Sequence, residues 1–286
     1  MTERIVEALV TTQWLAERLG DPDLRIVDAS WHMPATGRSG RAEFIAAHIP
    51  CAVFLDIDAL SDRSNPAPHM LPAAEDFGAA MGALGIARDD RVIVYDNSPL
   101  RTAARGWFML RHFGAANVAI LDGGLQKWVT EGRPTEAGQA GGEAAVFEAQ
   151  PQAQVVTKAQ VLAGLDTPLV DARGRPRFEG AEADPRPGVA AGHIPGARNL
   201  AFAELYNADG TFKDRETLRR LFQQAGIDPA RPFVASCGSG VTAGSLIFAA
   251  YLLGNDQTRL YDGSWSEYGA DPATPKESGP SAFRAS

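Results

Sequence analysis

One of the two cysteines in the chain lies in a setting that favours chemistry. Cys237 follows the apolar residues 233–235 and precedes the glycine-rich residues 238–240, after which comes an apolar run at 243–253. The first run predicts a buried strand and the second a helix. A glycine-rich loop between a strand and a helix directs several backbone N–H groups at one point. Such a loop stabilises a thiolate, so we expect Cys237 to be a nucleophile. The alternative is an inert buried thiol, since free cysteines are often buried.

The other cysteine, Cys51, lacks this setting. It precedes the apolar residues 52–55, which predict a strand, and no glycine-rich loop follows. Free cysteines are among the most frequently buried residues, so we expect Cys51 to be structural. A chain with two cysteines, one of them reactive, has no disulfide framework and suits a reducing cytosol.

An internal repeat supplies the elements that must position Cys237. Four segments recur in the same order: Ile26-Val-Asp-Ala as Leu169-Val-Asp-Ala, Ala47-His-Ile-Pro as Gly192-His-Ile-Pro, Val92-Ile-Val-Tyr-Asp as Phe233-Val-Ala-Ser-Cys, and Leu121-Asp-Gly-Gly as Tyr261-Asp-Gly-Ser. Their spacings are nearly equal in the two copies, which indicates a duplicated domain. We expect one domain at 1–134, a linker rich in Gly, Ala, Gln and Glu at 135–154, and a second domain at 155–286.

Within each copy, short apolar runs alternate with helix signals. The runs at 24–27, 92–95 and 118–121 are continuous, as expected for parallel strands that are covered on both faces. Thr157 followed by Gln160 is a capping-box pattern before a helix. The alternation predicts an α/β fold with two tandem doubly wound domains around parallel sheets. Ligands of such sheets bind outside the carboxyl ends of the strands, which is where Cys237 is expected.

Charge and hydropathy exclude several classes of partner. The net charge of −8 argues against general binding of nucleic acids or anionic membranes. No stretch approaches the roughly 20 apolar residues of a membrane span, and we expect no signal peptide at the N-terminus. A cytoplasmic protein without nucleic-acid or membrane partners is therefore expected. No spacing of histidine and cysteine indicates a metal site.

The Cys237 loop resembles the active-site loop of the rhodanese superfamily of sulfurtransferases. Its Cys-Gly-Ser-Gly-Val-Thr form is specifically similar to the members that act on 3-mercaptopyruvate. The resemblance covers about residues 11–275, although residues 97–107 match only loosely. It implies two rhodanese-like domains, of which only the second is catalytic, because Asp96 stands where the second copy has Cys237 and a carboxylate cannot carry sulfur. We expect Asp96 to cap a turn or a helix.

The resemblance also implies a set of residues that bind the substrate. Arg177 and Arg186, in the polar segment 174–191, match positions that hold the substrate carboxylate, and two guanidinium groups suit bidentate recognition. The alternative is that both are solvated surface arginines. The loop N–H groups would hold the sulfur; they belong to Gly238, Gly240, Val241 and Thr242.

A catalytic chain is implied as well. Asp58 and His69 match a pair that has been proposed to act with the loop serine, here Ser239, in polarising or protonating the substrate carbonyl. The alternative is a loop in which Asp58 caps a helix and His69 is exposed. His48 and His193 occur in both copies, of which one lacks the nucleophile, so we expect both to be structural.

The activity implied is sulfur transfer in two steps. Cys237 attacks the sulfur of 3-mercaptopyruvate, pyruvate leaves, and the resulting persulfide passes its outer sulfur to a thiol, thioredoxin or cyanide. Neither a metal nor an organic cofactor is implied.

Three other functions are weighed against this one. A thiosulfate:cyanide sulfurtransferase shares the fold and the persulfide, but its loop typically carries cations where this chain has Gly238 and Ser239. A cysteine phosphatase needs an arginine six positions after its nucleophile, where this chain has Ala243. A non-enzymatic binding module of the same fold would tolerate loss of the nucleophile, whereas Cys237 and its loop are intact.

Overall fold

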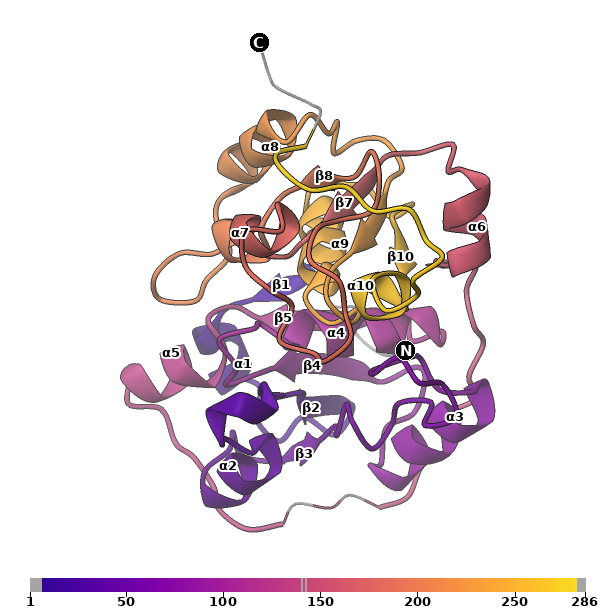
Figure 1. Ribbon diagram of the computed structural model, residues 1–286. Helices are drawn as coiled ribbons and strands as arrows, with labels where there is room; N and C mark the ends of the chain where they lie inside the picture. The colour runs from indigo at the N-terminus through magenta and orange to yellow at the C-terminus, as the bar shows by residue number, and fades with distance from the viewer. Residues whose placement is uncertain (1–6, 140, 142, 282–286) are drawn as a thin grey trace. The chain divides into compact units, whose positions relative to one another are not determined.

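The computed structural model describes residues 7–139, 141 and 143–281 (Figure 1). The chain divides into two compact units, each with its own sheet. The first holds the chain up to Ser61, Leu71–Ala153 and Asn207–Phe212, and the second holds Asp62–Met70, Gln154–Tyr206 and the chain from Lys213. A short segment from each half of the sequence thus belongs to the unit formed mainly by the other half. In the part of the chain described, no helix is long and apolar enough to cross a membrane.

The first unit contains a five-stranded parallel sheet in the order β1-β5-β4-β2-β3. Its strands are β1 (Leu9–Val10), β2 (Leu24–Asp28), β3 (Ala52–Phe54), β4 (Arg91–Tyr95) and β5 (Val118–Leu121). Its helices are α1 (Thr12–Ala16), α2 (Gly40–Ala46), α3 (Ala74–Ala83), α4 (Ala103–His112) and α5 (Gly124–Thr130), with a 3₁₀ turn at Pro34–Thr36. Strands β4 and β5 are buried throughout, as their continuous apolar runs predict.

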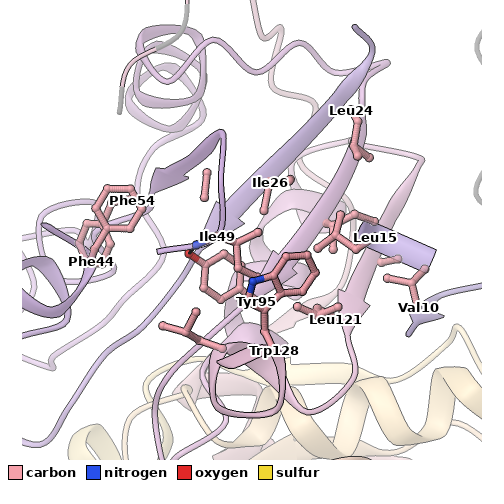
Figure 2. Close-up of a cluster of buried hydrophobic side chains, with 14 residues drawn as sticks. Val10, Leu15, Leu24, Ile26, Phe44, Ile49, Phe54, Tyr95, Leu121 and Trp128 are labelled. Carbon is pink, nitrogen blue, oxygen red and sulfur yellow. Dashed lines mark hydrogen bonds between the residues drawn. The ribbon is translucent and has the colours of Figure 1, made fainter. Parts of the chain in front are cut away.

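The core of the first unit packs against the central strands of the sheet (Figure 2). Tyr95 from β4 and Trp128 from α5 are both fully buried in this cluster. The short helix α1 adds Leu15, and it begins where Thr11 accepts a hydrogen bond from the N–H of Trp14. Burial of large side chains of this kind supplies most of the free energy that stabilises such a domain.

The second unit repeats the same topology, with strands in the order β6-β10-β9-β7-β8, all parallel. They are β6 (Val155–Val156), β7 (Leu169–Asp171), β8 (Arg198–Asn199), β9 (Val234–Ser236) and β10 (Arg259–Tyr261). The helices are α6 (Lys158–Ala163), α7 (Arg175–Phe178), α8 (Arg215–Gln224), α9 (Ala243–Leu252) and α10 (Ser264–Tyr268), with a 3₁₀ turn at Phe202–Leu205. The predicted capping box forms at α6. Matching strand orders confirm the α/β fold and its duplication.

The two shared histidines have equivalent surroundings in the two units. Nδ1 of His48 lies 2.7 Å from the carbonyl oxygen of Phe44, and its ring stacks on that phenylalanine at 4.0 Å. Nδ1 of His193 lies 2.9 Å from the carbonyl oxygen of Phe178, with a stacking distance of 3.8 Å. Both histidines are buried. Their buried contacts within each unit confirm a structural role.

Cys51 differs from its prediction. Its side chain is exposed, so it is not a packed structural cysteine. Its φ of 64° lies in the left-handed region, where the second copy places Gly196 with a φ of 74°. The N–H of Cys51 donates to Oε2 of Glu136, and that of Gly196 to Oε2 of Glu277. The backbone turn, and not the thiol, is therefore what the two copies share.

Candidate active site

Cys237 is the first residue after β9, and its side chain is buried. Its N–H donates to Oγ of Ser264 at 3.1 Å, and its carbonyl accepts from the N–H of Trp265 at 3.0 Å. The carbonyl of Gly238 accepts from the N–H of Ser266 at 2.8 Å. The first turn of α10 therefore fixes the start of the loop, while α9 begins at Ala243 and fixes its end.

The loop N–H groups have different partners in the two units. In the first unit, Oδ1 of Asp96 accepts from the N–H of Ser98 at 2.9 Å, and Oδ2 accepts from that of Ala103, the first residue of α4, at 2.7 Å. Asp96 thus caps the turn and the helix, as predicted. Burial is the largest influence on the pKa of Asp96 and raises it, whereas these two backbone donors act in the opposite direction.

In the second unit, Cys237 replaces that capping carboxylate. Among the residues that the structure describes, the N–H groups of four loop residues donate to no protein acceptor: Ser239, Val241, Thr242 and Ala243. All four precede or begin α9, where the helix dipole favours negative charge. The N–H groups of this loop can therefore donate to an anion at the end of β9.

Arg177 and Arg186 converge on one carboxylate. Nη2 of Arg177 lies 2.6 Å from Oδ2 of Asp184, and Nη1 of Arg186 lies 3.2 Å from Oδ1 of the same residue. The two arginine side chains are only 23% and 21% exposed, and the Asp184 side chain is 1% exposed. The arginines are therefore not fully solvated surface residues. The predicted polar loop begins instead with the short helix α7, which carries Arg177.

Gly238 brings this arginine pair next to the nucleophile. A methyl group on Gly238 would lie 3.1 and 3.2 Å from Nη1 and Nη2 of Arg186, and 3.5 Å from Nη2 of Arg177. Both guanidinium groups therefore lie against the residue that follows Cys237. The lack of a side chain at this position permits their close approach.

Asp184 is a site residue that has no sequence pattern to mark it. Burial favours its protonated form, but the Arg186 N–H and the guanidinium groups of Arg177 and Arg186 outweigh that effect and hold the pKa of Asp184 below its usual value. The carboxylate is therefore ionised at neutral pH. Its position two residues before Arg186 permits an Asx turn, in which Oδ1 accepts from the Arg186 N–H at 3.0 Å.

The first unit has the opposite charge at the position of Arg177. Phe44 and Phe178 are equivalent, since both stack on the repeated histidine, and the preceding residue is Glu43 in one case and Arg177 in the other. Glu43 accepts from Nε and Nη2 of Arg38 at 2.6 and 2.8 Å. These hydrogen bonds hold the pKa of Glu43 below its usual value. The first unit therefore lacks both the thiol and this clamp arginine.

His69 lies beside the Cys237 loop. Nδ1 of His69 is 2.8 Å from Oγ of Ser239, and both residues are buried, which rules out an exposed His69. His69 has a φ of 62°, in the left-handed region. Its segment is closed by a hydrogen bond from the N–H of Asp62 to the carbonyl of Met70. Asp58 belongs to the first unit, where its Oδ2 accepts from Nε1 of Trp31 at 2.9 Å.

The chain matches known proteins over nearly its whole length. The model of the rhodanese-like domain matches residues 11–131 and again residues 157–271. The 3-mercaptopyruvate sulfurtransferase of Rattus norvegicus is 42% identical over 275 residues, which cover 93% of each chain. The thiosulfate sulfurtransferase of Mus musculus is 41% identical over 276 residues, which cover 92% of each. The crystal structure of SseA, described as a 3-mercaptopyruvate sulfotransferase of Escherichia coli, superposes with a TM-score of 0.82 at 39% identity and covers 91% of this chain and 99% of its own.

Two parallel sheets of identical strand order and two matches to one domain model lead to the same assignment. The chain belongs to the rhodanese family and contains two tandem rhodanese-like domains.

Proposed function

We propose that this protein transfers sulfur from 3-mercaptopyruvate through a persulfide on Cys237. The observation that carries the proposal is the convergence of Arg177 and Arg186 on Gly238, the residue that follows Cys237. A donor whose carboxylate is separated from its sulfur by two carbons needs a nucleophile and a remote carboxylate clamp in one site. Both are supplied by the second unit.

In the first half-reaction, the Cys237 thiolate attacks the thiol sulfur of 3-mercaptopyruvate. A sulfur–sulfur bond forms and the carbon–sulfur bond breaks, with its electron pair passing to carbon as the enolate of pyruvate. The enolate takes up a proton and pyruvate leaves, while the sulfur remains on Cys237 as a persulfide. Arg177 and Arg186 hold the donor carboxylate in register during this step.

The developing negative charge on the ketone oxygen needs a hydrogen-bond donor. Ser239 is suited to this role when Oγ accepts a hydrogen bond from Nδ1 of His69, 2.8 Å away, because its own hydroxyl proton is then left for the ketone oxygen, and both residues are buried. We include Asp58 in this chain on the strength of its sequence resemblance alone. Its role in the proposal is to orient the His69 ring.

The loop N–H groups hold the persulfide as an anion. In this proposal the donors are the N–H groups of Gly238, Gly240, Val241 and Thr242, and the start of α9 adds its dipole. In the second half-reaction, a thiol, thioredoxin or cyanide attacks the outer sulfur and the Cys237 thiolate leaves. Alternating half-reactions of this kind give ping-pong kinetics.

In this proposal residues 1–134 form the non-catalytic domain, in the sense that it lacks the nucleophile although it supplies Asp58 and His69 in sequence; 135–154 form the linker and 155–286 the catalytic domain. Asp96 and Glu43 support the first assignment, because they replace the nucleophile and one clamp arginine with carboxylates. A reducing, cytoplasmic location suits a catalytic thiol that must remain unoxidised.

The test is a single turnover without acceptor. The protein is mixed with 3-mercaptopyruvate, the pyruvate released is counted, and the Cys237 peptide is weighed by mass spectrometry. We expect one pyruvate per chain and a mass gain of one sulfur atom on that peptide, and cyanide should remove the gain. Pyruvate release without a persulfide would overturn the proposal, as would a larger kcat/KM for thiosulfate than for 3-mercaptopyruvate.

A further inference from the structure

The two arginines next to Gly238 carry a built-in counter-ion. One oxygen of Asp184 binds each guanidinium group, Oδ2 to Arg177 and Oδ1 to Arg186, and the Arg186 N–H holds Oδ1 as well. The carboxylate is buried almost completely, while each arginine keeps about a fifth of its side chain exposed. Asp184 therefore lies deeper than the pair and contacts one Nη atom of each guanidinium group, so the other Nη atom of each group does not bind it.

The net charge of this group is the quantity that matters for a ligand. Two guanidinium groups and one ionised carboxylate leave a net charge of +1, because the pKa of Asp184 is held below its usual value by its two partners. A net charge of +1 neutralises a single carboxylate. Against a dianion it leaves one charge unpaired in a site that is partly withdrawn from water, which is costly.

We propose that Asp184 determines donor specificity: by lowering the net charge of the arginine clamp, it favours monoanionic donors and disfavours dianionic donors such as thiosulfate. This inference rests on the proposed function of the same site. Asp184 is a positioning and charge-setting residue, because it acts on the substrate through the two arginines. Geometry adds to the charge effect, since a carboxylate that bridges both guanidinium groups fixes their separation. Among the described residues Nε of Arg177 is buried without a hydrogen-bond partner, so Asp184 is the acceptor that holds this guanidinium group.

The experiment compares two sulfur donors of similar shape that differ by one charge. Thiosulfate is a dianion and leaves as sulfite; methanethiosulfonate is a monoanion and leaves as methanesulfinate, and each transfers its outer sulfur to Cys237. The ratio of their kcat/KM values is measured with cyanide as acceptor for the wild type and for Asp184→Asn. We expect the asparagine variant to shift the ratio toward thiosulfate by roughly tenfold or more, because its clamp carries +2.

Two further variants separate charge from structure. Asp184→Glu keeps the charge and should keep the preference of the wild type. Asp166→Asn removes an exposed carboxylate that pairs with Arg259, so it makes the same change in total charge away from the loop. It should leave the ratio unchanged.

If Asp184→Asn does not fold, Arg186→Gln provides the test, because it lowers the clamp charge to zero. It must shift the ratio toward methanethiosulfonate. An unchanged ratio in the folded Asp184→Asn or Arg186→Gln variant would overturn the inference, as would an equal shift in Asp166→Asn. Failure of the proposed function is a separate outcome: the wild type would then form no persulfide from 3-mercaptopyruvate, whatever the ratio of the two charge probes.

Discussion

The Ser239 hydroxyl lies 2.8 Å from Nδ1 of His69, although 170 positions separate the two residues in the sequence. The segment Asp62–Met70 packs within the compact unit that contains the Cys237 loop, and this packing brings the two residues together. A hydroxyl oxygen that accepts from the imidazole keeps its own proton for a substrate carbonyl, and the contact fixes the position of that donor.

Removal of this hydroxyl should affect the two donors unequally. We expect Ser239→Ala to lower kcat/KM for 3-mercaptopyruvate by about 10- to 100-fold, or roughly 1.4–2.7 kcal/mol, because the enolate oxygen loses its donor. Thiosulfate leaves as sulfite and forms no enolate, so its kcat/KM should fall less. Steady-state kinetics with both donors on one preparation is the measurement. Equal losses for the two donors would show that Ser239 supports only the loop.

The nucleophile is tested by exchanging the two cysteines separately. Cys237→Ser should abolish persulfide formation while the fold is kept, because a serine hydroxyl stays protonated in this loop. Cys51→Ser should keep most of the activity, since that side chain is exposed and only its backbone turn is shared with the second copy. Single-turnover release of pyruvate and circular dichroism check both. An inactive Cys51→Ser beside an active Cys237→Ser would reassign the site.

The arginine clamp has a matched control on the same short helix. Arg177→Leu and Arg186→Leu should each lower kcat/KM for 3-mercaptopyruvate. The corresponding loss of transition-state stabilisation should be about 1.5–3 kcal/mol, the usual range for hydrogen bonds to charged groups. A lysine at either position should restore only part of the lost kcat/KM, because an ammonium group cannot bind a carboxylate through two parallel hydrogen bonds. Arg175→Leu, at an exposed position of α7, should have little effect. Near-wild-type kinetics for both leucine variants would show that Arg177 and Arg186 do not bind the substrate carboxylate.

Local sequence signals were sufficient for most of the fold. Continuous apolar runs predicted the central strands, and the glycine-rich residues between a strand and a helix placed Cys237 at the carboxyl end of β9. The capping box at Thr157 formed as its spacing predicts. Each of these features depends on residues within a few positions of one another, so a pattern can report it.

What the sequence could not predict depends on contacts between distant residues or on rare backbone conformations. Asp184 lies in a polar segment and becomes part of the site only because two arginines converge on it. The left-handed backbone at Cys51 has no marker in the sequence, because the residue there is not a glycine. The prediction of a structural cysteine relied on the general tendency of free cysteines to be buried, which does not hold at this turn. The helix α7 is a single turn, shorter than any periodicity that could reveal it.

Stability should depend on pH through buried carboxyls. Burial raises the pKa of Asp28 to about 7. The folded state therefore keeps a proton that the unfolded chain releases, so this stabilising contribution is full below about pH 4 and is lost as the pH rises through about 7. In Asp28→Asn, which keeps an oxygen to accept the Ser30 N–H, the free energy of unfolding should fall less steeply over this window.

The difference in slope between the two proteins should be at most about 1.4 kcal/mol per pH unit. Urea unfolding at several pH values measures it. Burial also raises the pKa of Asp96 and that of Asp122, the latter to about 6, so the wild type alone cannot isolate Asp28. Parallel curves for the wild type and Asp28→Asn would show that Asp28 is ionised in the folded protein.

Donor choice should respond to the size of residue 238, because the arginine clamp occupies the space that a side chain would need. In Gly238→Ala, the methyl group would lie 3.1 Å from Nη1 of Arg186, which Asp184 holds in place. We expect the clamp to shift and kcat/KM for 3-mercaptopyruvate to fall by about tenfold, mainly through KM. Gly238→Arg with Ser239→Lys should displace the clamp further and place cations beside Cys237, where sulfite leaves, so thiosulfate activity should rise as 3-mercaptopyruvate activity falls. Steady-state kinetics with both donors checks this, and a donor ratio unchanged from the wild type in the double variant would show that these two positions do not set donor choice.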